Sequence, residues 1–246
     1  MVSIESVLWS AHVFSILHKP QSRARYNRNT SVRITISKEN YLKAIAEAES
    51  EGENVKAVTL SRWLEVSAPA VTMAIKRLKR DDLIRVGDEA QITLTVAGRE
   101  IATRLLHRHH LIERMLAEIF GLEWYKVHDE AEALEHAVSA DFERKLAEKL
   151  GNGRVCPHGN LVVDSPRERR GRGLKPLEEA HCHERVSVAS VFERDRAFLE
   201  DLDRKGIRPG VALEVLAVGD EVAVGAADKT VRLDRAAAAK VWVGRA

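Results

Sequence analysis

Four side chains that can bind a divalent metal recur within a short segment, at His128, Glu132, Glu135 and His136. Steps of three and four residues place side chains on one stripe of an α-helix. Carboxylate oxygens and imidazole nitrogens together form a ligand set that Mn²⁺, Fe²⁺ and Zn²⁺ accept. We therefore interpret the stripe as a metal site, the alternative being a solvated polar face of the helix.

A second pair, His109 and Glu113, has the same i, i+4 spacing and can add ligands from a preceding helix. The order Glu132-x-x-Glu135-His136 also resembles the inverted zinc-protease motif His-x-x-Glu-His, with a glutamate in place of the first histidine. A zinc metallohydrolase is therefore an alternative function, although no water-activating base or substrate cleft can be named. A regulator in which the metal is only structural is another.

Length and composition allow several small domains and exclude some classes of protein. The chain has 246 residues, 45% of them hydrophobic, enough for more than one core. A formal net charge of only +2 does not by itself indicate nucleic acid. Two cysteines exclude a disulfide framework and suit a reducing cytoplasm. Since no apolar run approaches a membrane span, we expect a cytoplasmic protein that does not enter a membrane.

The elements before the metal residues predict a DNA-binding unit. A helix should begin near Ser37, followed by two short helices and two strands at 58–66, 70–80, 83–86 and 91–95. Pro69 suits the first turn of the third helix, where its missing N–H costs nothing. Helix, break, helix and hairpin make a winged helix-turn-helix, whose second helix enters the DNA major groove.

Basic residues gather on that recognition helix, at Lys76, Arg77, Lys79 and Arg80. Such side chains hold DNA phosphates. We therefore favour DNA binding over a structural helical hairpin with a solvated basic face.

The rest of the chain predicts two long apolar helices and a small β-barrel. The helices, over 98–120 and 124–150, offer a dimer contact as well as a core. The expected fold is mainly α with a small β part. We expect five segments: a flexible extension, a winged helix-turn-helix, a helical dimerisation and metal domain, a linker and a barrel, at 1–36, 37–97, 98–164, 165–185 and 186–246.

In this order the blocks resemble the diphtheria toxin repressor family of metal-dependent transcriptional regulators, from about Ser37 to the C-terminus. The motifs that carry the resemblance are Glu39-Asn40-Tyr41-Leu42, Ser67-Ala68-Pro69, His109-His110-Leu111-Ile112-Glu113-Arg114, Lys126-Val127-His128-Asp129-Glu130-Ala131, Glu135-His136 and Cys156-Pro157-His158-Gly159-Asn160. The resemblance implies that the barrel is an SH3-like domain of the FeoA type. It also implies a homodimer that binds palindromic, double-stranded operator DNA and controls metal-homeostasis genes.

The resemblance implies two metal sites per subunit. The first would use Glu132, Glu135, His136 and Asn40. A glutamate at position 132, where iron-responsive members have a cysteine, favours Mn²⁺, while Fe²⁺ remains acceptable. Asn40 departs from the family, whose members have Met or Asp there, and Lys43 replaces a glutamate that some manganese sensors use for a second ion.

The second site is implied in two forms. Iron-responsive members would use the positions of His109, Glu113 and His128. Manganese-responsive members would use those of Glu113, Cys156 and His158 with an acid from the barrel, here Glu193 or Asp195. The triplet His181-Cys182-His183 lies outside the family motifs and is expected to be exposed.

On the DNA side, the resemblance implies that Ser67 and Pro69 contact thymine methyl groups. It implies that Thr72, Lys76 and Arg77 hold phosphates, and that Met73 faces the groove where relatives often have a polar residue.

Overall fold

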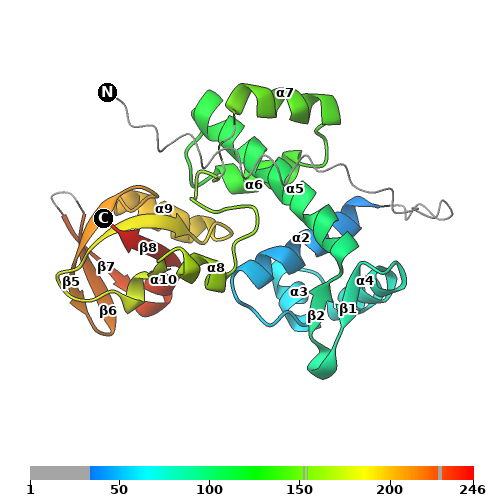
Figure 1. The fold of residues 1–246 in the computed structure, drawn as a ribbon, viewed down its shortest axis with the longest axis horizontal. Helices are drawn as coiled ribbons and strands as arrows, with labels where there is room; N and C mark the ends of the chain where they lie inside the picture. Colours follow the sequence, from blue (N-terminus) through cyan, green and yellow to red (C-terminus); the bar gives the residue numbers. More distant parts are fainter. Residues whose placement is uncertain (1–33, 152, 154, 227–228) are drawn as a thin grey trace, which may run out of the picture. The chain divides into compact units, whose positions relative to one another are not determined.

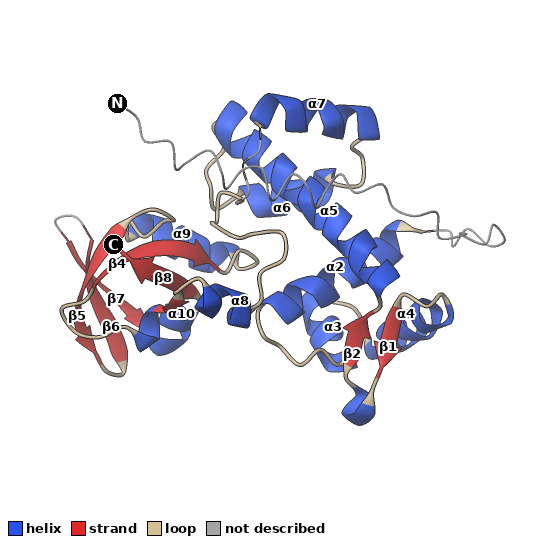
Figure 2. Ribbon diagram, in the orientation of Figure 1, coloured by secondary structure: helices blue, strands red, loops and turns tan. Residues whose placement is uncertain are grey.

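The structure is a computed structural model that describes residues 34–246 except 152, 154 and 227–228. Nearly all of the predicted N-terminal extension, 1–36, therefore lies outside the described residues. The chain's helices and strands are labelled in Figure 1 and coloured by type in Figure 2.

The winged helix-turn-helix is present and confirms the prediction. It consists of α2 (Ile36–Ser50), α3 (Ala57–Leu64), α4 (Ala68–Arg80), β1 (Ile84–Val86) and β2 (Ile92–Leu94). Strands β1 and β2 pair antiparallel, with Arg85 opposite Thr93. Its core is built from apolar side chains of all three helices and both strands, among them Leu42, Ile45, Leu60, Val71, Leu78, Ile84 and Ile92.

Helix α4 buries one face and exposes the other, as its amphipathic pattern predicts. Val71 and Leu78 are buried in the core. The predicted DNA contacts are all exposed, at Ser67, Pro69, Thr72, Met73, Lys76 and Arg77. The unit thus presents a basic, polar helix face that is available to DNA.

A long helix, α5 (Val96–Arg114), leaves the wing and continues as a π-helical segment, η3 (Met115–Ile119). Gly98 lets α5 start close to the hairpin, because a Cβ there would lie 2.0 Å from the Leu83 carbonyl oxygen. The helix also packs along α2, so one continuous helix joins the DNA-binding unit to the helices that follow.

The prediction of one continuous helix over 124–150 is wrong. It is broken into α6 (Val127–Leu134) and α7 (Ala140–Leu150). The Ser139 hydroxyl accepts a hydrogen bond from the Phe142 N–H and starts α7 as an N-cap. As a consequence Glu135 caps the end of α6 and His136 lies beyond it, so the four side chains predicted to bind metal do not share one helix stripe.

The C-terminal part is the predicted small β domain, whose strands form one sheet that is separate from the β1–β2 hairpin of the wing (Figure 2). Its strands are β3 (Lys175–Pro176), β4 (Arg185–Val191), β5 (Ala212–Val218), β6 (Glu221–Ala226), β7 (Lys229–Asp234) and β8 (Val241–Arg245), in the order β3-β8-β4-β5-β6-β7. The pairings of β4–β8 and β5–β6 each shift register, which bends the sheet around its apolar core. Two short helices, α9 (Arg196–Arg204) and α10 (Arg235–Ala239), complete the domain.

The segment predicted as a linker is structured instead. It contains α8 (Pro166–Gly171), the edge strand β3 and a 3₁₀ turn at Leu177–Glu179. Ser165 and Glu168 form a capping box at the start of α8, and Leu177 is buried in the sheet's core. Among the described residues, no helix is long and apolar enough to span a membrane.

Candidate metal centre

The first predicted site lies where α2 meets the end of α6. Asn40 of α2 places its Oδ1 2.7 Å from the Nε2 atom of His136. The same nitrogen is 3.5 Å from Oε1 of Glu135. Three of the four predicted ligands thus converge from two elements distant in sequence, and Glu39 holds the other ring nitrogen of His136 at 3.0 Å.

Glu132, the fourth predicted ligand, lines the same pocket, of about 420 Å³, but is engaged by cations. Its Oε1 atom lies 3.1 Å from the Arg194 guanidinium and 3.6 Å from the Lys43 ammonium. Although partial burial opposes ionisation, these two cations lower the pKa of Glu132 to about 2. The side chain is 41% exposed, so it is open to solvent at the pocket.

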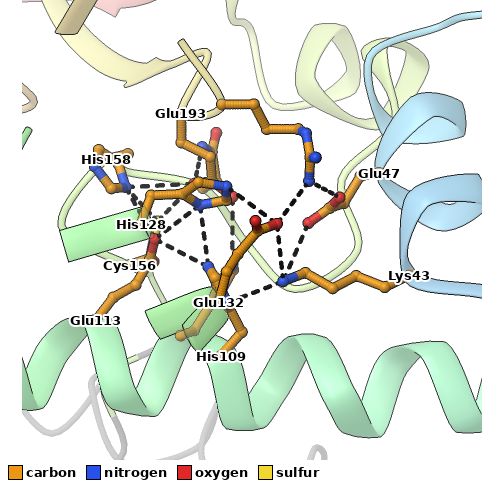
Figure 3. A network of polar contacts seen from close by, with 12 residues as sticks. Lys43, Glu47, His109, Glu113, His128, Glu132, Cys156, His158 and Glu193 are labelled. Carbon is orange, nitrogen blue, oxygen red and sulfur yellow. Dashed lines mark hydrogen bonds and ion pairs between the residues drawn. The ribbon is translucent and has the colours of Figure 1, made fainter. Parts of the chain in front are cut away.

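Lys43, which the sequence marks as a replacement for a ligand glutamate, adds a cation to this region. Its ammonium is buried 2.8 Å from Oε2 of Glu135 and also faces Glu132 and Glu47 (Figure 3). Burial opposes a charged lysine, but these carboxylates raise the pKa of Lys43 above its ordinary value. A fixed positive charge therefore neutralises carboxylates at the point where α2 packs against α6.

A second group, deeper in the protein, consists of His109, Glu113 and His128. The Nε2 atom of His109 lies 3.2 Å from Oε1 of Glu113 and 3.0 Å from Nδ1 of His128. The Nδ1 atom of His128 is 3.3 Å from the same glutamate oxygen. Atoms about 2.1 Å from one metal ion are separated by about 3.0–3.5 Å, so these three have the spacing of ligands.

Cys156, His158 and Glu193 lie directly beside that group, as Figure 3 shows. The Cys156 thiol donates to Oε2 of Glu193 at 3.2 Å, and Nδ1 of His158 is 3.5 Å from the same oxygen. Asp195, the other acid considered from the sequence, caps α9 and pairs with Lys240 instead. Glu193 is therefore the barrel acid that reaches the cluster.

The turn from Cys156 to Asn160 positions these ligands against the barrel. Gly159 has a positive φ of +83°, and a Cβ on it would lie 2.0 Å from the carbonyl oxygen of Ala189. The Asn160 amide donates to the Val191 carbonyl and, at 2.7 Å, to Glu193. Only glycine allows this close approach, which sets the thiol and the imidazole beside the strand end that carries Glu193.

Two histidines each use one ring nitrogen in a hydrogen bond outside the cluster, so that the other ring nitrogen faces the cluster. Nε2 of His158 donates to the Trp124 carbonyl at 2.8 Å, so Nδ1 faces Glu113 and Glu193. Nδ1 of His109 lies 2.7 Å from Glu135, so Nε2 faces Glu113. Partners of this kind behind a histidine fix its tautomer in metal sites.

The pKa shifts show how the cluster balances its charges without metal. Burial opposes protonation of both histidines, but the carboxylates raise the pKa of His109 to about 9 and that of His158 to about 10. His109 and His158 in turn lower the pKa of Glu113, against the effect of burial. Burial and the nearby carboxylates raise the pKa of the Cys156 thiol. A divalent cation can replace these protons, so the residues fit a metal.

Sequence reasoning missed His110, which belongs with Glu113, Cys156 and Glu193 in one group of potential ligands. The available signal was the His109-His110 doublet, since His110 is i, i+3 to Glu113. The triplet His181-Cys182-His183 is exposed, as expected, and the Cys182 thiol donates to the Leu216 carbonyl.

Three domain families match successive parts of the chain. Residues 33–89 match the iron dependent repressor N-terminal DNA binding domain, 95–163 its metal binding and dimerisation domain, and 175–245 the FeoA domain. The chain is 31% identical over 189 residues to the diphtheria toxin repressor of Corynebacterium efficiens, covering 72% of this chain and 82% of that protein. The chain belongs to the diphtheria toxin repressor family.

Other members of the family are also similar. The iron-dependent repressor IdeR of Mycobacterium leprae is 38% identical over 124 residues, which are 50% of this chain and 54% of that protein. A manganese-dependent transcriptional repressor solved in complex with manganese superposes with a TM-score of 0.75 at 32% identity, covering 85% of this chain and all of that one. The manganese regulator SloR gives a TM-score of 0.71 at 25% identity, covering 87% and 100%.

Proposed function

We propose that this chain is a transcriptional repressor whose operator binding is switched on by Mn²⁺ or Fe²⁺ at the site of Asn40, Glu132, Glu135 and His136. The observation that carries the proposal is the 2.7 Å contact between Asn40 and His136. Asn40 belongs to the DNA-binding unit, and His136 follows α6 in the helical domain. A cation held by both sides would fix one against the other.

Metal acts in this mechanism because it binds the DNA-competent arrangement better than other arrangements. Two subunits would associate through the helical domain, which exposes large apolar side chains at Ile119, Phe120, Leu134 and Phe142. The two α4 helices of a dimer would then enter successive major grooves of a palindromic operator, about 34 Å apart.

The donor set supports Mn²⁺ with Fe²⁺ as the alternative. Two carboxylates, an amide oxygen and one imidazole are mostly hard ligands, and no thiolate is among them. A repressor that responds to these ions is suited to control genes for their uptake and storage.

An enzymatic role is the weaker candidate, because Glu135, which stands at the catalytic glutamate of the zinc-protease motif, is held by the Lys43 ammonium at 2.8 Å and by Nδ1 of His109 at 2.7 Å. Although burial opposes ionisation, His109 and Lys43 lower the pKa of Glu135 below its ordinary value, which makes the carboxylate a weaker general base. We therefore infer a regulatory rather than a hydrolytic role for the metal.

The test is operator binding by variants at saturating Mn²⁺, with Glu130→Ala as the matched control, since Glu130 is exposed on the same helix. Glu132→Ala should abolish the response to metal and His158→Ala should weaken it. The proposal is wrong if Glu132→Ala responds to Mn²⁺ as the control does.

A further inference from the structure

We propose that Glu113 bridges two adjacent metal ions in a single dinuclear centre, and that His110 is one of its ligands. This inference takes the class of metal, a divalent cation of the Mn²⁺, Fe²⁺ and Zn²⁺ type, from the proposed function, and to that extent it rests on it. It goes further in uniting two groups of ligands into one centre and in adding a histidine that the family motifs do not assign.

The two groups meet at one carboxylate. Oε1 of Glu113 lies 3.2 Å from His109 and 3.3 Å from His128 on one side. On the other side it is 3.4 Å from Nδ1 of His158. One oxygen atom therefore stands at ligand-like distances from three imidazoles that belong to both groups.

The other oxygen of the same carboxylate has no hydrogen-bond partner among the described residues. Oε2 of Glu113 is buried and makes no hydrogen bond, although the side chain is fully enclosed. An unsatisfied buried carboxylate oxygen is costly and rare, so it requires an explanation. A second cation supplies one, because a carboxylate can give one oxygen to each of two ions.

His110 supplies the second observation. The residue is buried, and Nε2 lies 4.0 Å from Oε1 of Glu193. Within the part of the chain that the structure describes, Nδ1 has no hydrogen-bond partner. Ligand atoms of His110, Glu113, Cys156 and Glu193 all fall within 4.8 Å of one another. The imidazole is thus placed beside a thiol and two carboxylates with no hydrogen bond to hold it there.

The charges also fit two ions. The centre offers two carboxylates and a thiol, which becomes a thiolate when it binds metal, together with four imidazoles. Three negative charges against four positive ones leave a net charge of +1, so the ligands accommodate two ions without a large charge imbalance.

The test counts ions and detects their coupling in full-length protein that carries Glu132→Ala and His136→Ala to remove the first site. Titration with Mn²⁺ should give two ions per chain, and electron paramagnetic resonance should show a spin-coupled pair. One ion per chain, or two that give the six-line spectrum of isolated Mn²⁺, would overturn the proposal.

His110→Gln in the same background should weaken the binding of one of the two ions about 10-fold or more. His107→Gln is the matched control, since His107 is exposed on the same helix, and it should bind both ions as the parent does. Equal affinities for the two variants would exclude His110 as a ligand. None of these measurements uses DNA. They therefore test the dinuclear centre even if operator binding does not depend on metal.

Discussion

Glu135 and His109 are joined by a 2.7 Å contact between a carboxylate oxygen and Nδ1 of the imidazole, buried between α5 and the end of α6. The other oxygen of Glu135 faces His136 at 3.5 Å. Glu135 is thus a candidate ligand of the first site and, at the same time, the partner that orients a histidine of the second. The two candidate sites share a side chain.

Glu135→Gln should therefore weaken both sites. It removes a charged ligand from the first and the acceptor behind His109 in the second, each worth about 10–100-fold in metal affinity. Isothermal titration with Mn²⁺ measures both. Glu130→Gln, an exposed change on α6, is the control, and a loss confined to one site would contradict the sharing.

Removing the Lys43 ammonium should destabilise the metal-free protein. Lys43→Met leaves Glu135 buried next to an apolar side chain, and breaking a buried ion pair costs about 3–5 kcal/mol. Urea unfolding in the presence of a chelator measures this. Lys145→Met removes an exposed ion pair on α7 and should cost less than about 1 kcal/mol. Equal losses for the two variants would refute the structural role of Lys43.

Stability of the metal-free protein should fall as the pH rises from about 7 to 10. The carboxylates raise the pKa of His158 to about 10 and that of His109 to about 9, above the value of about 6.5 expected when unfolded. Their contribution is fully present below pH 6.5 and is lost as pH rises through the folded values.

The same protons must leave when metal binds, so Mn²⁺ affinity should rise over that pH interval. Urea midpoints and metal titrations at pH 7, 8 and 9 measure both trends. His158→Gln should flatten the stability curve, and a curve as steep as that of the parent would speak against this assignment.

Lys76→Ala on the recognition helix should weaken operator and random DNA alike, because a phosphate contact carries no sequence information. It should also lower the dependence of log K on log salt by about 1. Fluorescence anisotropy across a salt series measures this. Lys149→Ala, an exposed change on α7, should leave the slope unchanged, and a slope unaltered by Lys76→Ala would remove that residue from the interface.

Much of the fold was predictable, because local signals agreed with the tertiary structure. Pro69 at the start of α4 and the spacing of Val71 and Leu78 placed the recognition helix, and alternating apolar residues placed the strands. The break after Leu134 was missed because Ser139, an N-cap signal, lies in an otherwise continuous helical pattern. The edge strand β3 was missed because a two-residue strand has no period.

The site was predictable as a set of residue types but not as a geometry. Glu132, Glu135 and His136 were selected for their spacing, yet the contact of His136 with Asn40 depends on how α2 packs. Lys43 was singled out only as a departure from a ligand position, and Arg194 was missed. The pairing of either cation with Glu132 becomes visible only when the folded chain brings them together. His110 was missed because its neighbours Cys156 and Glu193 lie far along the sequence.

The most direct test of the account is the operator affinity of the unmodified protein, measured in Mn²⁺ and again after chelation. If metal at Asn40, Glu132, Glu135 and His136 fixes the DNA-binding unit, chelation should weaken operator binding by about 5–150-fold, the range of ordinary allosteric coupling, and added Mn²⁺ should restore it. An operator affinity that is the same in both conditions would contradict the account.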